Sequence, residues 1–60
     1  MVTIQVELTE NEALAFAQFL KRATLSDYRD RAANEEESFL MQHAGESIRK
    51  ALAESGFAPR

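Results

Sequence analysis

The 60-residue sequence contains no cysteine and a single histidine, His43. Disulfides, thiolate metal sites and a multi-histidine site within one chain are therefore excluded. No apolar run approaches the roughly 20 residues that span a bilayer. No basic segment precedes an apolar stretch at the N-terminus, so a signal peptide is not expected either. The absence of cysteine fits a cytoplasmic protein.

Positive charge is also scarce, since 7 Lys and Arg stand against 10 Asp and Glu, which gives a net charge of −3. Nucleic acids and anionic membranes are bound by basic faces, so this balance argues against both, although a local basic patch remains open. No glycine-rich phosphate loop or nucleophile motif occurs. We therefore expect no enzyme activity, no cofactor and no bound metal.

The small size of the chain has its own consequence. Residues 1–60 form one domain at most, and such a chain buries only roughly 60% of the surface that its unfolded form exposes. Small domains usually gain stability from disulfides, a metal or a partner chain. Because the first two are not expected here, the sequence predicts a homodimer.

The N-terminus shows alternating polarity. In "VTIQVEL" the β-branched and apolar residues Val2, Ile4, Val6 and Leu8 alternate with Thr3, Gln5 and Glu7. This period of two predicts a half-buried β-strand. No second such stretch follows, and a lone strand leaves its backbone N–H and C=O groups unpaired. We therefore expect this strand to pair with the same strand of a second chain.

Helices are expected after this strand, because both glycines and the one proline lie at or after position 45. A helix is predicted over about 10–22, where Thr9 and Glu12 form a capping box. Its apolar arc is broad enough to pack on two neighbours, since Leu14 and Phe19 widen the face formed by Ala13, Phe16, Ala17 and Leu20. Residues 23–33 are either a short helix capped by Ser26 or an irregular connector, and we favour the helix.

The longest helix is predicted over about 35–55 after Asn34 as N-cap. Its apolar stripe is formed by Leu40, Met41, Ala44, Ile48, Ala51 and Leu52. Gly56 fits the left-handed position after the helix, with Phe57 packed near Leu52. The predicted fold class is thus α+β, mostly α, with one N-terminal strand and two main helices.

The polar face of this long helix holds the candidate partner surface, which consists of Phe39, His43, Glu35 and Glu36. Three glutamates in a first turn are what a helix start favours, although they also set the local potential. A Phe on a polar face needs a partner, which is either Tyr28 or another protein. Gly45 lies inside the same helix, either because another backbone approaches closely or because it is tolerated.

Residues 2–22, "VTIQVELTENEALAFAQFLKR", resemble the start of ribbon–helix–helix proteins. The resemblance implies antiparallel strand pairing across a two-fold axis and DNA reading by Thr3, Gln5 and Glu7. The chain departs from that family because no Lys or Arg lies on the strand. If the helix over 35–55 is the family's second helix, Glu35 to Glu37 would repel phosphate; if that helix begins at Ser26, Arg29 and Arg31 are available but the helix is short. The whole chain, especially "KALAESGFAPR", is also similar to a group of short uncharacterised bacterial proteins.

Two functions are consistent with these features. The first is a non-enzymatic homodimer that acts by binding another protein, as small acidic inhibitors or adaptors of phages, plasmids and bacteria do. The alternative is a ribbon–helix–helix DNA-binding regulator or antitoxin.

Overall fold

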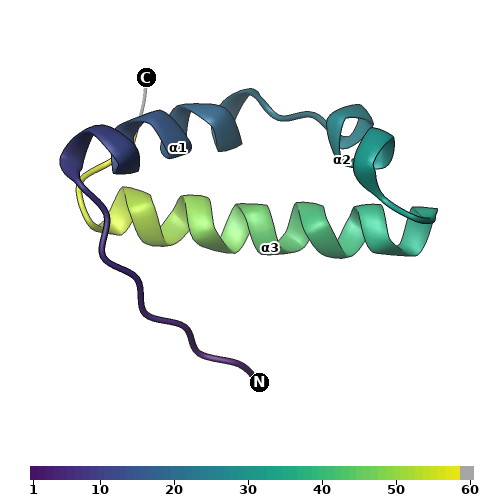
Figure 1. Cartoon of the computed structure of the whole chain (residues 1–60), viewed down its shortest axis with the longest axis horizontal. Coiled ribbons are helices and arrows are strands. Elements are labelled where there is room, and N and C mark those ends of the chain that lie inside the picture. The colour runs from purple at the N-terminus through teal and green to yellow at the C-terminus, as the bar shows by residue number, and fades with distance from the viewer. Residues whose placement is uncertain (59–60) are drawn as a thin grey trace.

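The computed structural model describes residues 1–58, which form three helices and no strand. The helices are α1 (Glu10–Arg22), α2 (Leu25–Arg31) and α3 (Glu35–Glu54) (Figure 1). The predicted α+β class is therefore wrong, because residues 1–9 hold no secondary structure. The alternating pattern is real, but a strand also needs a neighbour to complete its hydrogen bonds, and residues 1–58 provide none.

The two long helices lie where the sequence places them, because their end signals are local. The Thr9 hydroxyl accepts the Glu12 N–H at 3.1 Å, and the Glu12 carboxylate accepts the Thr9 N–H at 2.9 Å, which confirms the capping box. The Asn34 side chain accepts the Glu37 N–H at 2.9 Å and caps α3.

The end of α3 is a Schellman motif, as the sequence predicts. Gly56 has a φ of 98°, in the left-handed region. The Gly56 N–H donates to the Ala53 carbonyl at 3.0 Å, and the Phe57 N–H donates to the Leu52 carbonyl at 2.8 Å. These two bonds turn the chain back so that Phe57 is half-buried against the helix end.

The connector contains the short helix α2, but Thr24 caps it and not Ser26. The Thr24 hydroxyl accepts the Asp27 N–H at 3.3 Å, and the Asp27 carboxylate accepts the Thr24 N–H at 2.8 Å. This second capping box uses the T-x-x-D spacing. It sets the start of α2 two residues earlier than a Ser26 cap would.

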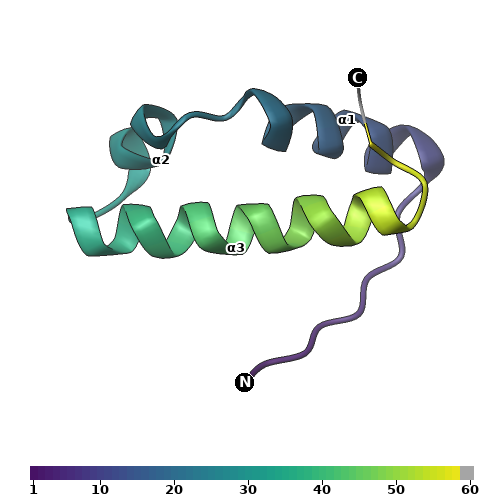
Figure 2. The ribbon, with the colours of Figure 1, turned by 180° about the vertical axis from the view of Figure 1, so that it is seen from behind.

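Helices α1 and α2 lie one after the other along α3, with α2 over its N-terminal half and α1 over its C-terminal half (Figures 1 and 2). All three helices meet at Gly45. A Cβ placed there would collide with the hydroxyl of Tyr28 from α2 and lie 3.5 Å from Leu20 Cδ2 of α1. Close approach is therefore the reason for a glycine in this helix.

Few apolar side chains are buried by this packing: Ala13, Ala17 and Leu20, all from α1. On α3 the buried residues are Ser38 and Gly45, and the Ser38 hydroxyl donates to the Glu35 carbonyl at 2.5 Å. The side of α3 that faces α1 and α2 is thus not the centre of its apolar stripe. Leu40, Ala44 and Ile48 remain exposed.

Candidate interaction surface

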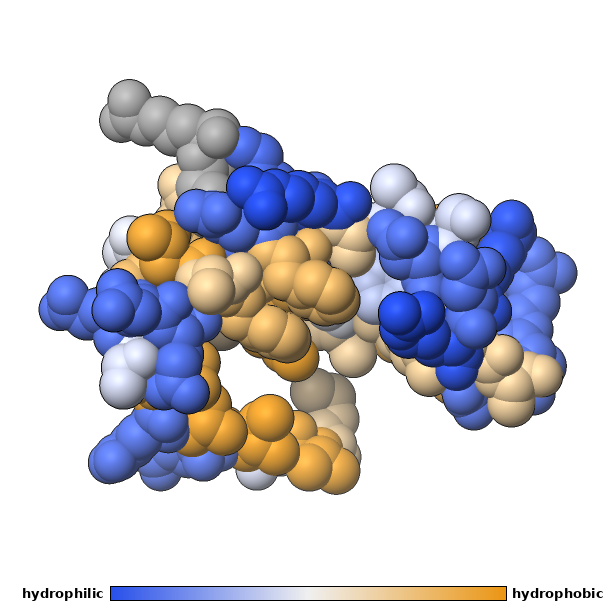
Figure 3. Space-filling model, turned by 45° about the horizontal axis from the view of Figure 1, so that its top comes forward, coloured by the Kyte–Doolittle hydropathy of each residue, from blue (hydrophilic) through white to orange (hydrophobic). Residues whose placement is uncertain are grey.

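One face of the molecule carries an apolar hollow of about 790 Å³, which we call the apolar groove. The N-terminal segment forms one wall, and α1 together with the end of α3 forms the other. Figure 3 shows hydrophobic surface on both sides of this hollow. The lining residues are Ile4, Gln5, Val6, Leu8, Glu12, Ala13, Phe16, Ile48, Ala51, Leu52, Ser55 and Phe57.

The chemistry of the groove is almost entirely apolar. Its one charged lining side chain within residues 1–58 is Glu12, and that carboxylate is already bound to the Thr9 N–H. This backbone hydrogen bond, together with one to the Thr9 side chain, holds the pKa of Glu12 below its ordinary value. No cation of the described residues lines the groove, so it suits an apolar occupant and offers nothing to a phosphate.

Most of the residues predicted for a dimer strand line this groove, and within residues 1–58 they form no strand. Val2, Ile4, Val6 and Leu8 are all exposed, and the last three line the groove. Among the residues predicted to read DNA, Gln5 also lines it, whereas Thr3 and Glu7 are exposed elsewhere on the segment.

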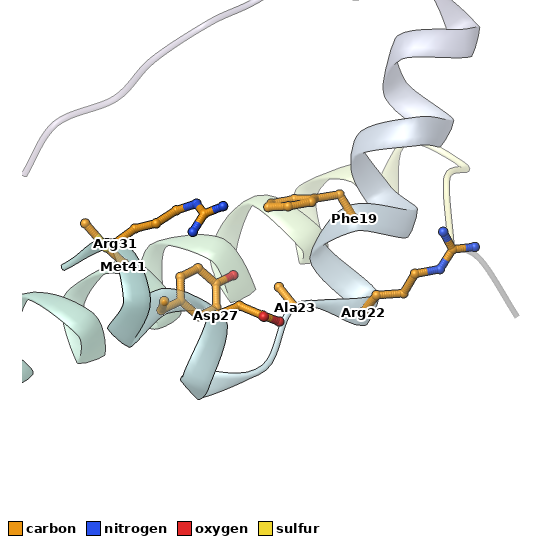
Figure 4. Close-up of a pocket in the computed structure, with 7 residues that line it drawn as sticks. Phe19, Arg22, Ala23, Asp27, Arg31 and Met41 are labelled. Atoms are coloured by element: carbon orange, nitrogen blue, oxygen red, sulfur yellow. The ribbon is translucent and has the colours of Figure 1, made fainter.

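A second, smaller hollow of about 440 Å³ lies where α1, α2 and α3 approach one another. Its lining is Phe19, Arg22, Ala23, Asp27, Tyr28, Arg31 and Met41. Figure 4 shows Arg31 and Phe19 pointing toward one another and Arg22 pointing away. Arg22 donates to Gln18 Oε1 at 3.0 Å. The ring of Phe19 stacks on that of Phe16, which lines the groove, at a centroid distance of 5.6 Å.

Asp27 in that second hollow has a structural task. Hydrogen bonds from the Thr24 backbone and then from its side chain lower the pKa of Asp27, with a smaller contribution from the charge of Arg31. The carboxylate is therefore held as the cap of α2. In the hollow, Asp27 thus fixes the start of α2.

The predicted partner surface on α3 is exposed. Phe39 keeps 42% of its surface open, and His43 and Glu36 are exposed beside it. Glu35 is engaged with Arg29 of α2 in an ion pair of 2.6 Å. The Glu35 side chain is still 64% exposed in that pair, so all four side chains form a small mixed surface outside the groove.

Within residues 1–58, no three or more His, Cys, Asp and Glu side chains are grouped so as to hold a metal ion. Over the same residues, no helix combines the length and the apolar character needed to cross a membrane.

Sequence reasoning missed Phe16, Ile48 and Phe57 as members of a site. Two signals pointed to them. The apolar arc of α1 is wider than one neighbour requires, and within residues 1–58 it packs on α3 alone among the helices. The apolar residues of the N-terminal segment also have no place in the small core.

These features define a small helical protein whose candidate site is a binding surface. The chain belongs to the family of unknown function DUF7706, which it matches over residues 1–60. No curated protein and no solved structure matches it. The resemblance to ribbon–helix–helix proteins therefore gains no support, and the strand on which it depends is absent from residues 1–58.

Proposed function

We propose that this protein is a non-enzymatic homodimer that acts by binding another protein. The observation that carries the proposal is the surface that one chain leaves open. The chain exposes 5173 Å², whereas a folded monomer of 6.8 kDa exposes about 4000 Å². Within the described residues, only three apolar side chains are buried, against eleven large apolar ones that are exposed.

The size of this excess fits a dimer. The excess exposed surface is about 1200 Å² per chain. This is close to the area that each partner buries in a small obligate complex, where the two partners together bury more than about 2000 Å². The radius of gyration agrees, because 12.1 Å is larger than the roughly 10 Å of a compact chain of this length. A second copy supplies the second neighbour that the broad arc of α1 requires.

A face of α3 remains available for another protein in such a dimer. Phe39 lies among polar residues outside the apolar groove, and aromatic side chains are enriched at the centres of protein interfaces. His43 and Glu36 surround it with polar groups that suit the rim of an interface. The net charge of −3 favours a partner with a basic surface.

The alternative of a DNA-binding regulator gains nothing from the geometry. Its strand is absent from residues 1–58, and Thr3, Gln5 and Glu7 have no Lys or Arg beside them on the segment. The start of α3 presents Glu35, Glu36 and Glu37, where a phosphate would need positive charge.

The first experiment is sedimentation equilibrium of the full chain over a concentration series. The expected mass is twice the 6.8 kDa of one chain at micromolar concentration. A single species of 6.8 kDa throughout would end the proposal of a dimer.

The second experiment identifies the binding face by comparing three immobilised baits, the wild type, Phe39→Ala and Leu14→Ala. The last is a matched control, since Leu14 is 43% exposed and Phe39 is 42% exposed. A stoichiometric partner should be retained by the wild type and by Leu14→Ala and lost by Phe39→Ala. Equal retention by all three would remove Phe39 from the proposal, and no partner for the wild type would overturn the binding function.

A further inference from the structure

The exposed apolar surface of α3 has a definite shape. Leu40, Ala44, Ile48 and Ala51 are exposed along one side of the helix, with Leu40 at 62% and Ile48 at 38%. Their spacing of four, four and three residues keeps them in one row. We call this row the α3 ridge.

The ridge continues into the apolar groove. Ile48 and Ala51 belong to the ridge and also line the groove. A convex row and a concave hollow therefore lie side by side on one continuous apolar patch. In a two-fold dimer, the patch on one copy packs against the identical patch on the other copy. The shape of the patch must therefore be complementary to its own shape. A ridge next to a groove satisfies this condition, because each ridge enters the groove of the other copy.

We propose that the occupant of the groove is the α3 ridge of a second copy, with the two α3 helices antiparallel and the two-fold axis between Ala44 and Ile48. This arrangement rests on the proposed homodimer and specifies its interface. Leu40 of one copy then faces Ala51 of the other, and Ala44 faces Ile48. Each large side chain meets a small one, which is how close-packed interfaces fill space without voids.

Charge selects the antiparallel direction. The first turn of α3 holds Glu35, Glu36 and Glu37. Parallel helices would place two such turns side by side, where like charges repel. The antiparallel arrangement separates them by the length of a 20-residue helix, about 30 Å.

The groove itself favours a second copy over a charged partner. Among the described residues, Glu12 is its one charged lining residue and is held by the Thr9 cap, so no free charge awaits an opposite one. An apolar ridge from a second copy would cover Ile4, Val6 and Phe16 together. This burial would account for the excess surface of the single chain.

The absence of native cysteine allows a clean test of the register in the full chain. Ala44→Cys and Ile48→Cys are prepared separately, mixed, allowed to exchange subunits and oxidised. The mixture should give about tenfold more crosslinked dimer than either variant alone, because a disulfide forms only where Cα atoms approach within about 7 Å. His43→Cys, which is exposed but off the ridge, serves as the control and should crosslink poorly.

The result separates the two proposals. A sample of doubled mass whose mixed variants crosslink no better than the His43→Cys control would overturn the ridge-in-groove arrangement and leave the homodimer intact. A chain of single mass at all concentrations would overturn both.

A pair of charge substitutions gives an independent check. Ile48→Glu would place a carboxylate at the centre of the interface and should raise the dimer dissociation constant at least about a hundredfold. Leu14→Glu changes a side chain of similar exposure that does not line the groove, so its dissociation constant should match the wild type. Equal dissociation constants for the two variants would contradict the arrangement. If Ile48→Glu loses its helical circular dichroism, the crosslinking result decides.

Discussion

The hydroxyl of Tyr28 occupies the space that a side chain on Gly45 would need. The ring carbon Cζ of Tyr28 lies 3.3 Å from the position of that missing Cβ, and Leu20 Cδ2 lies 3.5 Å from it. The three helices therefore approach one another at a point where α3 has no side chain. Gly45 costs α3 roughly 1 kcal/mol of helix propensity, and this close contact is what the chain gains in return.

The first prediction is that Gly45→Ala destabilises the wild type and does so through Tyr28. Overpacking costs about 1–3 kcal/mol, and the gain in helix propensity offsets roughly 1 kcal/mol of it. A net loss of about 1 kcal/mol is expected. Urea unfolding followed by circular dichroism measures it at fixed protein concentration, since the stability of the proposed dimer would depend on concentration.

The control for this prediction is Tyr28→Phe, which removes the atom nearest to Gly45. In that background Gly45→Ala should be neutral or stabilising by up to about 1 kcal/mol, because the hydroxyl clash is gone and the 3.3 Å contact with the ring carbon Cζ needs only a small shift. The double-mutant cycle then gives a coupling near 1 kcal/mol or more. Additive effects in the cycle would show that the Tyr28 hydroxyl does not set the helix junction.

The helix ends were predictable because each depends on neighbouring residues. At each helix end the two residues that matter lie within a few positions of one another, so sequence spacing fixes their geometry. The pairs are Thr9 with Glu12, Asn34 with Glu37, and Gly56 with Phe57. Thr24 was missed as the cap of α2 because Ser26 is equally good by residue type. The spacing does distinguish them, because Asp27 follows Thr24 by three residues as a capping box requires, whereas Arg29 follows Ser26.

The strand and the groove were not predictable in the same way. Period-two alternation at Val2, Ile4 and Val6 shows that one side of the segment is apolar, but pairing depends on a partner that the chain does not specify locally. The role of Gly45 likewise depends on Tyr28, which belongs to another helix. Tertiary contacts also decided that α3 turns Ser38 inward and leaves Leu40 exposed.

The second prediction concerns the cap of α1 and pH. The pKa of Glu12 in the folded chain lies below its ordinary value of 4.5, because the ionised carboxylate accepts the Thr9 N–H. Its contribution to stability is therefore complete above pH 4.5 and is lost as the pH falls through the lowered pKa. Thermal midpoints of the wild type should decrease over this acidic range.

Glu12→Gln isolates this effect from the other carboxylates. Glutamine retains an oxygen that accepts the Thr9 N–H but does not titrate. As the pH falls from about 5 to roughly 2.5, the variant should therefore lose less stability than the wild type. Thr9→Ala removes the cap itself and should cost about 1 kcal/mol at neutral pH. Parallel pH profiles for wild type and Glu12→Gln would contradict the assignment.

The third prediction tests the turn after α3. Gly56 has a φ of 98°, and no atom lies within 4 Å of the point where a Cβ would stand, so a substitution there is strained by the backbone and not by crowding. Gly56→Ala should therefore destabilise the chain by about 1 kcal/mol. Gly56→Asn should lose less, since asparagine adopts the left-handed region more readily. Equal losses in urea unfolding would point to a cause other than backbone conformation.

The fourth prediction separates the two roles considered for the N-terminal segment. Val6 lines the apolar groove and Val2 does not, although both are exposed in the single chain. If a second copy covers the groove, Val6→Ser removes apolar burial worth about 1.5 kcal/mol per chain. The dimer dissociation constant should then increase at least about tenfold, measured by sedimentation equilibrium.

Val2→Ser makes the same chemical change on the same segment and should leave the dissociation constant within about twofold of the wild type, since that side chain lies outside the groove. A strand that paired along its whole length between two chains would instead lose stability at both positions, because alternate residues of a strand share one face. Equal weakening by the two variants would therefore favour strand pairing in the dimer. If Val6→Ser alone weakens the dimer, the segment is the wall of the groove against which the second copy packs.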